Sequence, residues 1–267
     1  MTSQKQPVTG WQRTFVIWLD KRIYNLSKHW LRTFNIIVAI YVGLPILAPV
    51  LMNAGITTPA KLIYTLYSPM CHQMASRSFF LFGEQPSYPR EIAGTNLTPF
   101  EAYMPSLPEF TGVTPDNWVA FTFAARSFLG NEQMGYKMAL CERDMAIYGF
   151  VLIGGLLYGL LRKRFTIKPM PLLLFIILGM GPIGLDGFSQ LFGYYGTPYN
   201  GAEPNAVQAF LQSIFALRES TPLLRTLTGA IFGLSLVWLA YPHIEEGMRG
   251  TEATLRAKLT RIGELEV

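Results

Sequence analysis

Charged residues are scarce in this chain of 267 residues, at 15% of the total, whereas soluble domains usually carry about 25%. Half of the residues are hydrophobic, so the composition excludes an ordinary soluble domain and predicts a membrane protein. Histidine and cysteine are rare as well, with three and two copies, and neither a CxxC nor an HxxxH spacing is present. Motif spacing alone therefore gives only a weak signal for a metal site.

The amino terminus lacks the pattern of a cleavable signal peptide. Its charged region runs for some thirty residues, and no short apolar stretch is followed by a small-residue cleavage site. The first apolar run is therefore expected to remain in the protein as a membrane anchor.

Four apolar runs are long enough to cross a hydrocarbon core, which takes roughly 20 residues. They lie at about 34–56, 145–161, 170–191 and 223–241. The expected fold is all-α: a polytopic membrane helix bundle of about four transmembrane helices, with short interfacial helices and two extracytoplasmic insertions. We expect residues 1–267 to form a single membrane domain, because little of the chain is left for a separate soluble one.

Lysine and arginine concentrate before the first run, between the second and third, and after the fourth. Such residues stay on the cytoplasmic side of short loops. This predicts a multi-pass protein of the cell membrane with both termini cytoplasmic, in segments 1–33 and 242–267, and with extracytoplasmic loops 57–141 and 192–222. Contact with the lipid bilayer explains the net charge of +5, so no nucleic-acid binding is predicted.

Apolar residues recur at helical spacing over residues 11–31, opposite several charges. Two interpretations are open. The segment is either an interfacial helix on the inner leaflet, or it continues into the first crossing and packs on the bundle.

Polar residues cluster where the apolar runs meet the extracytoplasmic face, and ionisable groups at such places mark functional sites. Asp186 and Gln190 share one helix face, beyond an expected kink at Pro182. Ser220 stands just before Thr221-Pro222, a typical helix start, and Arg225 falls in the first turn. With Arg218, this start could bind a phosphate or carboxylate. Alternatively, Arg225 forms an ion pair with Asp186 or Asp144.

The two cysteines allow three interpretations. A Cys71–Cys141 disulfide fits an oxidising compartment. A zinc or similar divalent metal site could combine Cys71, His72 and Cys141 with Asp144 or Asp186. A free reactive thiol would need Arg143 or His72 nearby to lower its pKa.

An ordered series of motifs spans about residues 69–233. It consists of Cys71-His72-Gln73, Arg77-Ser78-Phe79-Phe80, Phe82-Gly83, Cys141-x-Arg143, Ile147-Tyr148-Gly149, Asp186-Gly187-x-x-Gln190, Leu217-Arg218-x-Ser220 and Arg225-x-x-Thr228-Gly229. The series resembles an uncharacterised family of prokaryotic integral membrane proteins, domain of unknown function 2085. The resemblance implies a multi-pass bundle whose polar motif residues gather at one membrane face. It brings no established activity, cofactor or substrate.

The chain departs from the family pattern in two insertions, at 84–140 and 194–215. Each contains a short amphipathic stretch, at 117–129 and 206–217, suited to lying on the outer leaflet or docking on another protein. In the motifs themselves, Ala146 replaces a frequent glycine. Asp144 stands where many relatives have another cysteine, which weakens the metal interpretation.

Three functions follow as hypotheses. In the first, the protein binds or acts on an amphiphile with an anionic head group, such as a lipid, prenyl compound or quinone. Asp186, Asp144 or His72 would be the acid or base, and the ligand-binding residues would be Arg218, Arg225, Ser220, Arg143, Gln190 and Arg77. In the second, it is an accessory subunit that docks on other membrane-complex subunits through its insertions. A small transporter is the third, although no inverted repeat is evident.

Overall fold

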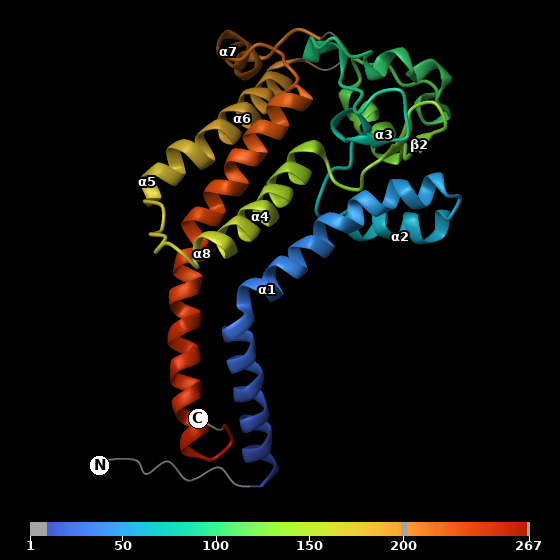
Figure 1. The fold of residues 1–267 in the computed structure, drawn as a ribbon. Helices are drawn as coiled ribbons and strands as arrows, with labels where there is room; N and C mark the ends of the chain where they lie inside the picture. Colours follow the sequence, from blue (N-terminus) through green and yellow to red (C-terminus); the bar gives the residue numbers. More distant parts are fainter. Residues whose placement is uncertain (1–9, 199–201, 266–267) are drawn as a thin grey trace.

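The computed structural model describes residues 10–198 and 202–265. Within these ranges four helices are long and apolar enough to cross a membrane, which confirms the predicted membrane helix bundle (Figure 1). They are α1 (Trp11–Asn53), α4 (Glu142–Leu161), a composite helix over Leu172–Gly196, and α8 (Pro222–Arg261).

Helices α1 and α8 are about twice as long as a single crossing requires. The first half of α1 and the last half of α8 run side by side away from the other helices (Figure 1). Ion pairs join them, with Lys21 Nζ 2.7 Å from Glu264 and Lys258 Nζ 2.6 Å from Asp20. At His29 the backbone leaves the helical range, and α1 bends there.

The amphipathic segment 11–31 runs into the first crossing across the bend at His29, where two helices join end to end. The predicted tail 242–267 likewise continues α8 as far as Arg261. The polar face of the α1 segment contacts α8, since Asp20 and Ser27 are buried. Its apolar stripe, including Trp11 and Phe15, stays exposed.

The third crossing is irregular, but not at Pro182. It consists of α5 (Leu172–Leu174), the π-helical segment η6 (Phe175–Met180) and α6 (Gly181–Gly196). Pro182 falls in the first turn of α6, where a missing backbone donor is tolerated. The distortion expected at Pro182 is thus found in the preceding turns, as a π-helical widening.

Glycine brings α4 and α8 into close contact. A Cβ at Gly233 would lie 2.4 Å from the carbonyl oxygen of Ile147, and one at Gly229 would lie 2.7 Å from that of Arg143. Without a hydrophobic drive between helices in lipid, such close backbone approach supplies packing energy. The α4–α8 pair forms the centre of the bundle.

The predicted loop 57–141 is a folded unit, which we call the cap. Helix α2 (Thr57–Tyr67) returns along α1, and the Tyr67 hydroxyl donates to the Tyr41 carbonyl at 2.7 Å. Short 3-10 turns follow: η1 (Ala75–Arg77), η2 (Glu91–Ala93), η3 (Phe100–Ala102), η4 (Met104–Ser106) and η5 (Pro108–Phe110). Helix α3 (Trp118–Ser127) confirms the amphipathic stretch predicted at 117–129. The second predicted stretch is α7 (Ala206–Ile214).

The cap has its own aromatic core, distinct from that of the bundle. Phe100, Phe110, Phe121 and Phe128 are buried together, and their rings meet mostly edge to face. A small antiparallel sheet in the order β1-β3-β2 closes it. Its strands are β1 (Phe80–Leu81), β2 (Gly130–Asn131) and β3 (Gly135–Lys137). This core holds the cap over the ends of α4, α6 and α8.

The α4–α8 contact predicts a difference between two glycine variants. Gly233→Ala should lower the free energy of unfolding by about 1–3 kcal/mol, because its methyl group has to displace backbone. Gly149→Ala in α4 is the control, since a Cβ there meets nothing within 4 Å. Thermal unfolding of both variants in detergent measures the effect, and equal stability would contradict this packing.

Candidate functional site

Asp186 on α6 lies at the centre of a hydrogen-bonded group at the cap end of the bundle. One carboxylate oxygen accepts from Arg218 at 2.8 Å, and the other accepts from Arg143 at 2.5 Å and from the Ser220 hydroxyl at 2.7 Å. Gln190, one turn along α6, accepts from the Ser220 backbone N–H at 3.0 Å. The structure thus brings together residues that the sequence placed in one site, but it leaves Asp186 buried and fully paired.

Arg225 is also paired, with acids other than those predicted. Its guanidinium donates to Glu142 at 3.0 Å and to Glu219, and its side chain is 3% exposed. The predicted pairing with Asp186 or Asp144 is wrong. Glu142 is closer because it occupies the first turn of α4, directly against α8. Sequence reasoning gave neither glutamate a role, although both lie inside the Cys141-x-Arg143 and Arg218-x-Ser220 motifs.

Glu219 binds two arginines at once. Arg77 Nε of the cap lies 2.7 Å from its carboxylate, Arg225 contacts the same oxygen, and the Tyr194 hydroxyl donates to the other at 2.5 Å. Burial alone would raise the pKa of the Glu219 carboxyl, but the arginines outweigh it and hold the pKa below its usual value. Glu219 therefore remains a carboxylate that joins cap, α6 and α8.

The helix start at α8 has the predicted form, but it is no open anion site. Thr221 is the N-cap and accepts from the Leu224 N–H, and Pro222 begins the helix. Ser220 and Arg225 are buried, and Glu219 fills the space expected for an external phosphate or carboxylate. The positive charge at this helix start is thus paired with a carboxylate of the protein itself, that of Glu219.

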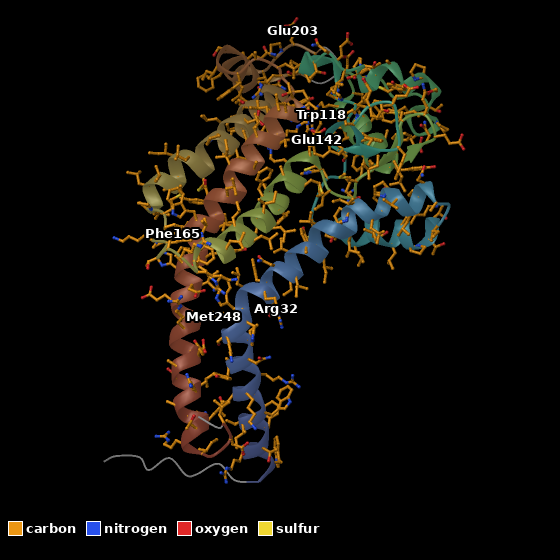
Figure 2. All side chains as sticks on the ribbon, in the orientation of Figure 1. Arg32, Trp118, Glu142, Phe165, Glu203 and Met248 are labelled. Carbon is orange, nitrogen blue, oxygen red and sulfur yellow. The ribbon has the colours of Figure 1, made fainter. Side chains whose placement is uncertain are left out.

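A cavity of about 330 Å³ lies between the cap and α6. Three arginines and four aromatic residues line most of it: Arg77, Arg90, Arg143, Trp118, Phe121, Tyr194 and Tyr195. Figure 2 shows Trp118 on α3 and Glu142 at the start of α4 at the same end of the molecule. Arg77 and Arg143 keep 28% and 24% of their side-chain surface exposed, so each offers free donors although it is ion-paired.

A second cavity of about 300 Å³ adjoins the first and shares some of its walls. The shared residues are His72, Met74, Arg77, Arg143 and Gln190. The second cavity also reaches Cys71, Cys141, Asp144 and Arg225. Arg218, Ser220 and Asp186 line neither space, so they support the walls from behind. Arg90 and Trp118 are wall residues that sequence reasoning missed, although the aromatic richness of the insertion was visible.

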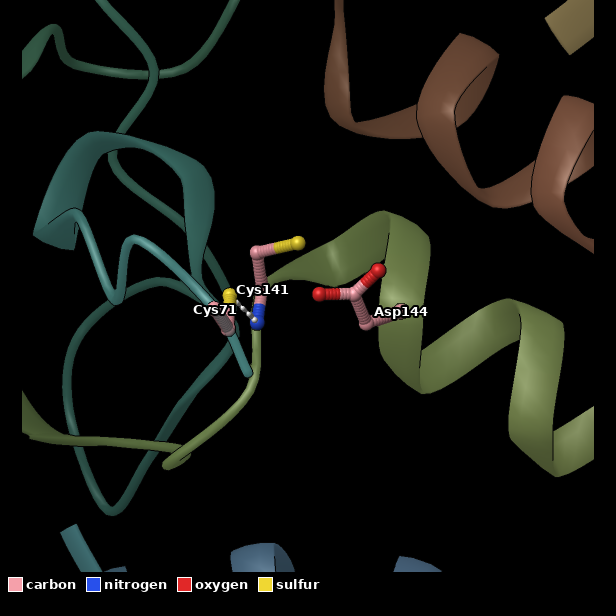
Figure 3. A group of neighbouring side chains, drawn as sticks. All are labelled: Cys71, Cys141 and Asp144. Atoms are coloured by element: carbon pink, nitrogen blue, oxygen red, sulfur yellow. Dashed lines mark hydrogen bonds between the residues drawn. The ribbon is translucent and has the colours of Figure 1, made fainter. Parts of the chain in front are cut away.

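Cys71, Cys141 and Asp144 meet at the start of α4 (Figure 3). Their ligand atoms lie within 4.8 Å of one another, and both thiols are free. His72 was predicted to join them as a metal ligand, but its exposed side chain lies outside this group, and Asp144 takes that place. The interaction with the neighbouring Cys141 thiol lowers the pKa of Cys71, against the effect of burial, and the same interaction, together with burial, raises the pKa of Cys141.

The turn that carries Cys71 is held in an unusual backbone conformation. Gln73 has φ 50°, in the left-handed region that residues other than glycine rarely adopt. Its side-chain amide donates to the carbonyls of Tyr64 at 2.8 Å and Ala139 at 2.9 Å. The buried Lys137 ammonium donates to the Gln73 carbonyl at 2.6 Å. These bonds fix Cys71 opposite Cys141.

Residues 124–239 match the model of a family described as "Predicted membrane protein (DUF2085)". The predicted family resemblance is confirmed. The matched segment contains Cys141, Arg143, Asp186 and Arg225, whereas Cys71 precedes it. The chain is also 26% identical over 180 residues, 67% of each protein, to an uncharacterized protein of Methanocaldococcus jannaschii. No solved structure matches the chain. Neither the family's description nor that of the relative states an activity.

The paired state of Glu219 predicts how stability depends on pH. Its folded pKa lies below the ordinary value of 4.5, so its contribution is complete above that pH and is lost as pH falls through the lowered pKa. Glu219→Gln should cost about 3 kcal/mol at neutral pH, because it removes the ion-pair partner of Arg77 and one of the two partners of the buried Arg225. It should also flatten the acid side of the stability profile.

Thermal unfolding of the detergent-solubilised protein between pH 7 and pH 3 measures both effects. Glu264→Gln is the control, because Glu264 pairs with Lys21 on the surface and its loss should leave the unfolding temperature unchanged. Equal acid sensitivity in Glu219→Gln and the unaltered protein would contradict the assignment.

Proposed function

We propose that this membrane protein binds an amphiphile with an anionic head group in the cavity between the cap and α6. The observation that carries the proposal is that arginine and aromatic side chains line the same cavity. Arg77 and Arg143 present partly exposed guanidinium groups, which bind phosphate and carboxylate oxygens through several parallel hydrogen bonds. Trp118 and Tyr195 add apolar surface beside them.

The charge balance supports an anionic ligand. Arg77, Arg143, Arg218 and Arg225 share only three carboxylates, those of Glu142, Asp186 and Glu219. A fourth carboxylate, that of Asp144, lines only the second cavity, and no acid is among the described residues that line the first. Arg77, Arg90 and Arg143 line the first cavity, so an anion bound there would meet guanidinium groups without a competing carboxylate on the wall.

The surroundings of the cavity suit a lipid tail. Leu191 on α6 lines the cavity and is exposed, as are the neighbouring Phe188 of α6 and Phe123 of α3. Leu191 and Phe188 belong to a membrane helix, where exposed apolar side chains face hydrocarbon. A head group in the cavity could thus keep its chain in the bilayer.

Binding is better supported than proton transfer. Asp186 is held by three donors and lines neither cavity, so it supports the wall and is not available as an acid or base for a molecule in the cavity. Asp144 and His72 remain accessible from the second cavity. The distribution of basic residues supports placing the cap outside the cell, with both termini cytoplasmic.

A second function, an accessory subunit of a membrane complex, is favoured by α7. Val207, Phe210 and Ile214 form an exposed apolar stripe on this short helix. Such a stripe can dock on a partner subunit or on the outer leaflet. Copurification of stoichiometric partner proteins in mild detergent, lost when Phe210 is replaced by serine, would favour this role over lipid binding.

Two arginine variants test the amphiphile proposal, because Arg143 and Arg218 share the partner Asp186 but only Arg143 lines the cavity. Arg143→Gln should weaken binding of short-chain phosphatidic acid about tenfold or more, the loss expected for a charge-assisted hydrogen bond. Arg218→Gln should leave the affinity unchanged.

The affinity is measured from the rise in unfolding temperature as lipid is added to the purified protein. Phosphatidylcholine with the same chains is the ligand control and should give a smaller rise. The proposal fails if the two lipids stabilise equally, or if both variants bind phosphatidic acid like the unaltered protein.

A further inference from the structure

We propose that Cys71, Cys141 and Asp144 bind a divalent metal ion such as Zn²⁺, with one coordination position left open toward the cavity. Two thiolates and one carboxylate form a mixed ligand set that suits zinc and similar borderline ions. Their ligand atoms lie within 4.8 Å of one another, whereas two sulfurs on one tetrahedral zinc ion stand roughly 3.8 Å apart. Small side-chain rotations would complete the set.

The sulfur of Cys71 is already placed as a metal ligand would be. It accepts the backbone N–H of Cys141 at 3.3 Å and that of Gln73 at 3.5 Å. Hydrogen bonds of this kind orient ligating atoms and stabilise their negative charge. The left-handed backbone of Gln73, kept in place by its bonds to Tyr64 and Ala139, is what turns its N–H toward the sulfur.

Asp144 differs from the other carboxylates at the cap end. Glu142, Asp186 and Glu219 each have an arginine partner, but across the residues described here no cation lies within salt-bridge distance of Asp144. Its place three residues after Cys141 would suit a helix-capping bond to the Cys141 N–H. That N–H instead donates to Cys71, so the carboxylate remains free beside the two sulfurs (Figure 3).

The open coordination position is what would give the metal ion a function. All three ligands line the second cavity, together with Arg77 and Arg143. Structural zinc sites usually have four protein ligands, whereas catalytic ones have three and hold water or substrate in the fourth position. An ion here would present its open side to a space lined by arginine, where an anionic oxygen could replace water. The metal site does not depend on the proposed amphiphile, because all three metal ligands are side chains of the protein.

Metal analysis of the purified protein tests the site. The unaltered protein, loaded with Zn²⁺ and freed of excess, should retain about one ion per chain, and Cys71→Ser and Asp144→Asn should each lower retention at least tenfold. His72→Ala is the matched control, because the neighbouring imidazole lies outside the group. Its metal content should equal that of the unaltered protein.

Thiol labelling of the unaltered protein keeps the test independent of mutant folding. Bound metal should protect both cysteines from alkylation, and a chelator should expose both without any reductant. Loading with Co²⁺ should give the sulfur-to-cobalt absorption of thiolate ligation, and this band should vanish in Cys141→Ser. A Cys71–Cys141 disulfide in the non-reduced protein, thiols that label equally with and without Zn²⁺, or loss of metal in His72→Ala would overturn the proposal.

Discussion

The buried guanidinium of Arg225 is the constraint on which the cap end of this protein depends. An arginine whose side chain is 3% exposed at the end of a membrane helix has to be paired, since an uncompensated charge there costs several kcal/mol. Glu142 supplies one partner from α4 and Glu219 supplies the other from the segment before α8. The first turns of α4 and α8 are therefore fixed to each other before any ligand is considered.

Through Glu219, the ion pairs of Arg225 also connect the helices to the cap. Glu219 cannot satisfy all its acceptor positions with Arg225 alone, and it takes Arg77 of η1 and Tyr194 of α6 as further donors. Arg225 also donates to the Ser76 carbonyl at 3.4 Å. Cap, α4, α6 and α8 thus share one hydrogen-bonded group. Arg143 and Arg218 share Asp186, and of these two arginines Arg143 also lines the cavities.

Hydropathy and charge were sufficient to predict the four crossings and the shared location of the polar residues. These features follow from the local composition of the chain, because a run of about 20 apolar residues has few stable structures other than a membrane-spanning helix. The acid that pairs with each arginine was not predictable in the same way. Whether Arg225 meets Asp186 or Glu142 depends on the rotation of α8 about its axis, and Gly229 and Gly233 set this rotation through backbone contacts with α4. A list of charged residues contains no such information.

The cap was the least predictable part, for a related reason. Its turns are held by an aromatic core assembled from residues far apart in sequence, such as Tyr88 and Phe128, and no local periodicity signals that core. The wall of the first cavity is built from both parts of the chain. Arg143, Gly187 and Gln190 come from the segment that matches the family, whereas Arg77, Arg90 and Trp118 come from the chain before it. Arginine and aromatic side chains reach this wall from both parts, since Arg143 and Tyr194 belong to the bundle and Arg90 and Trp118 belong to the cap. The cavity wall therefore depends on the fold of the cap, whereas the pairing of Arg225 with Glu142 depends on the contact between α4 and α8.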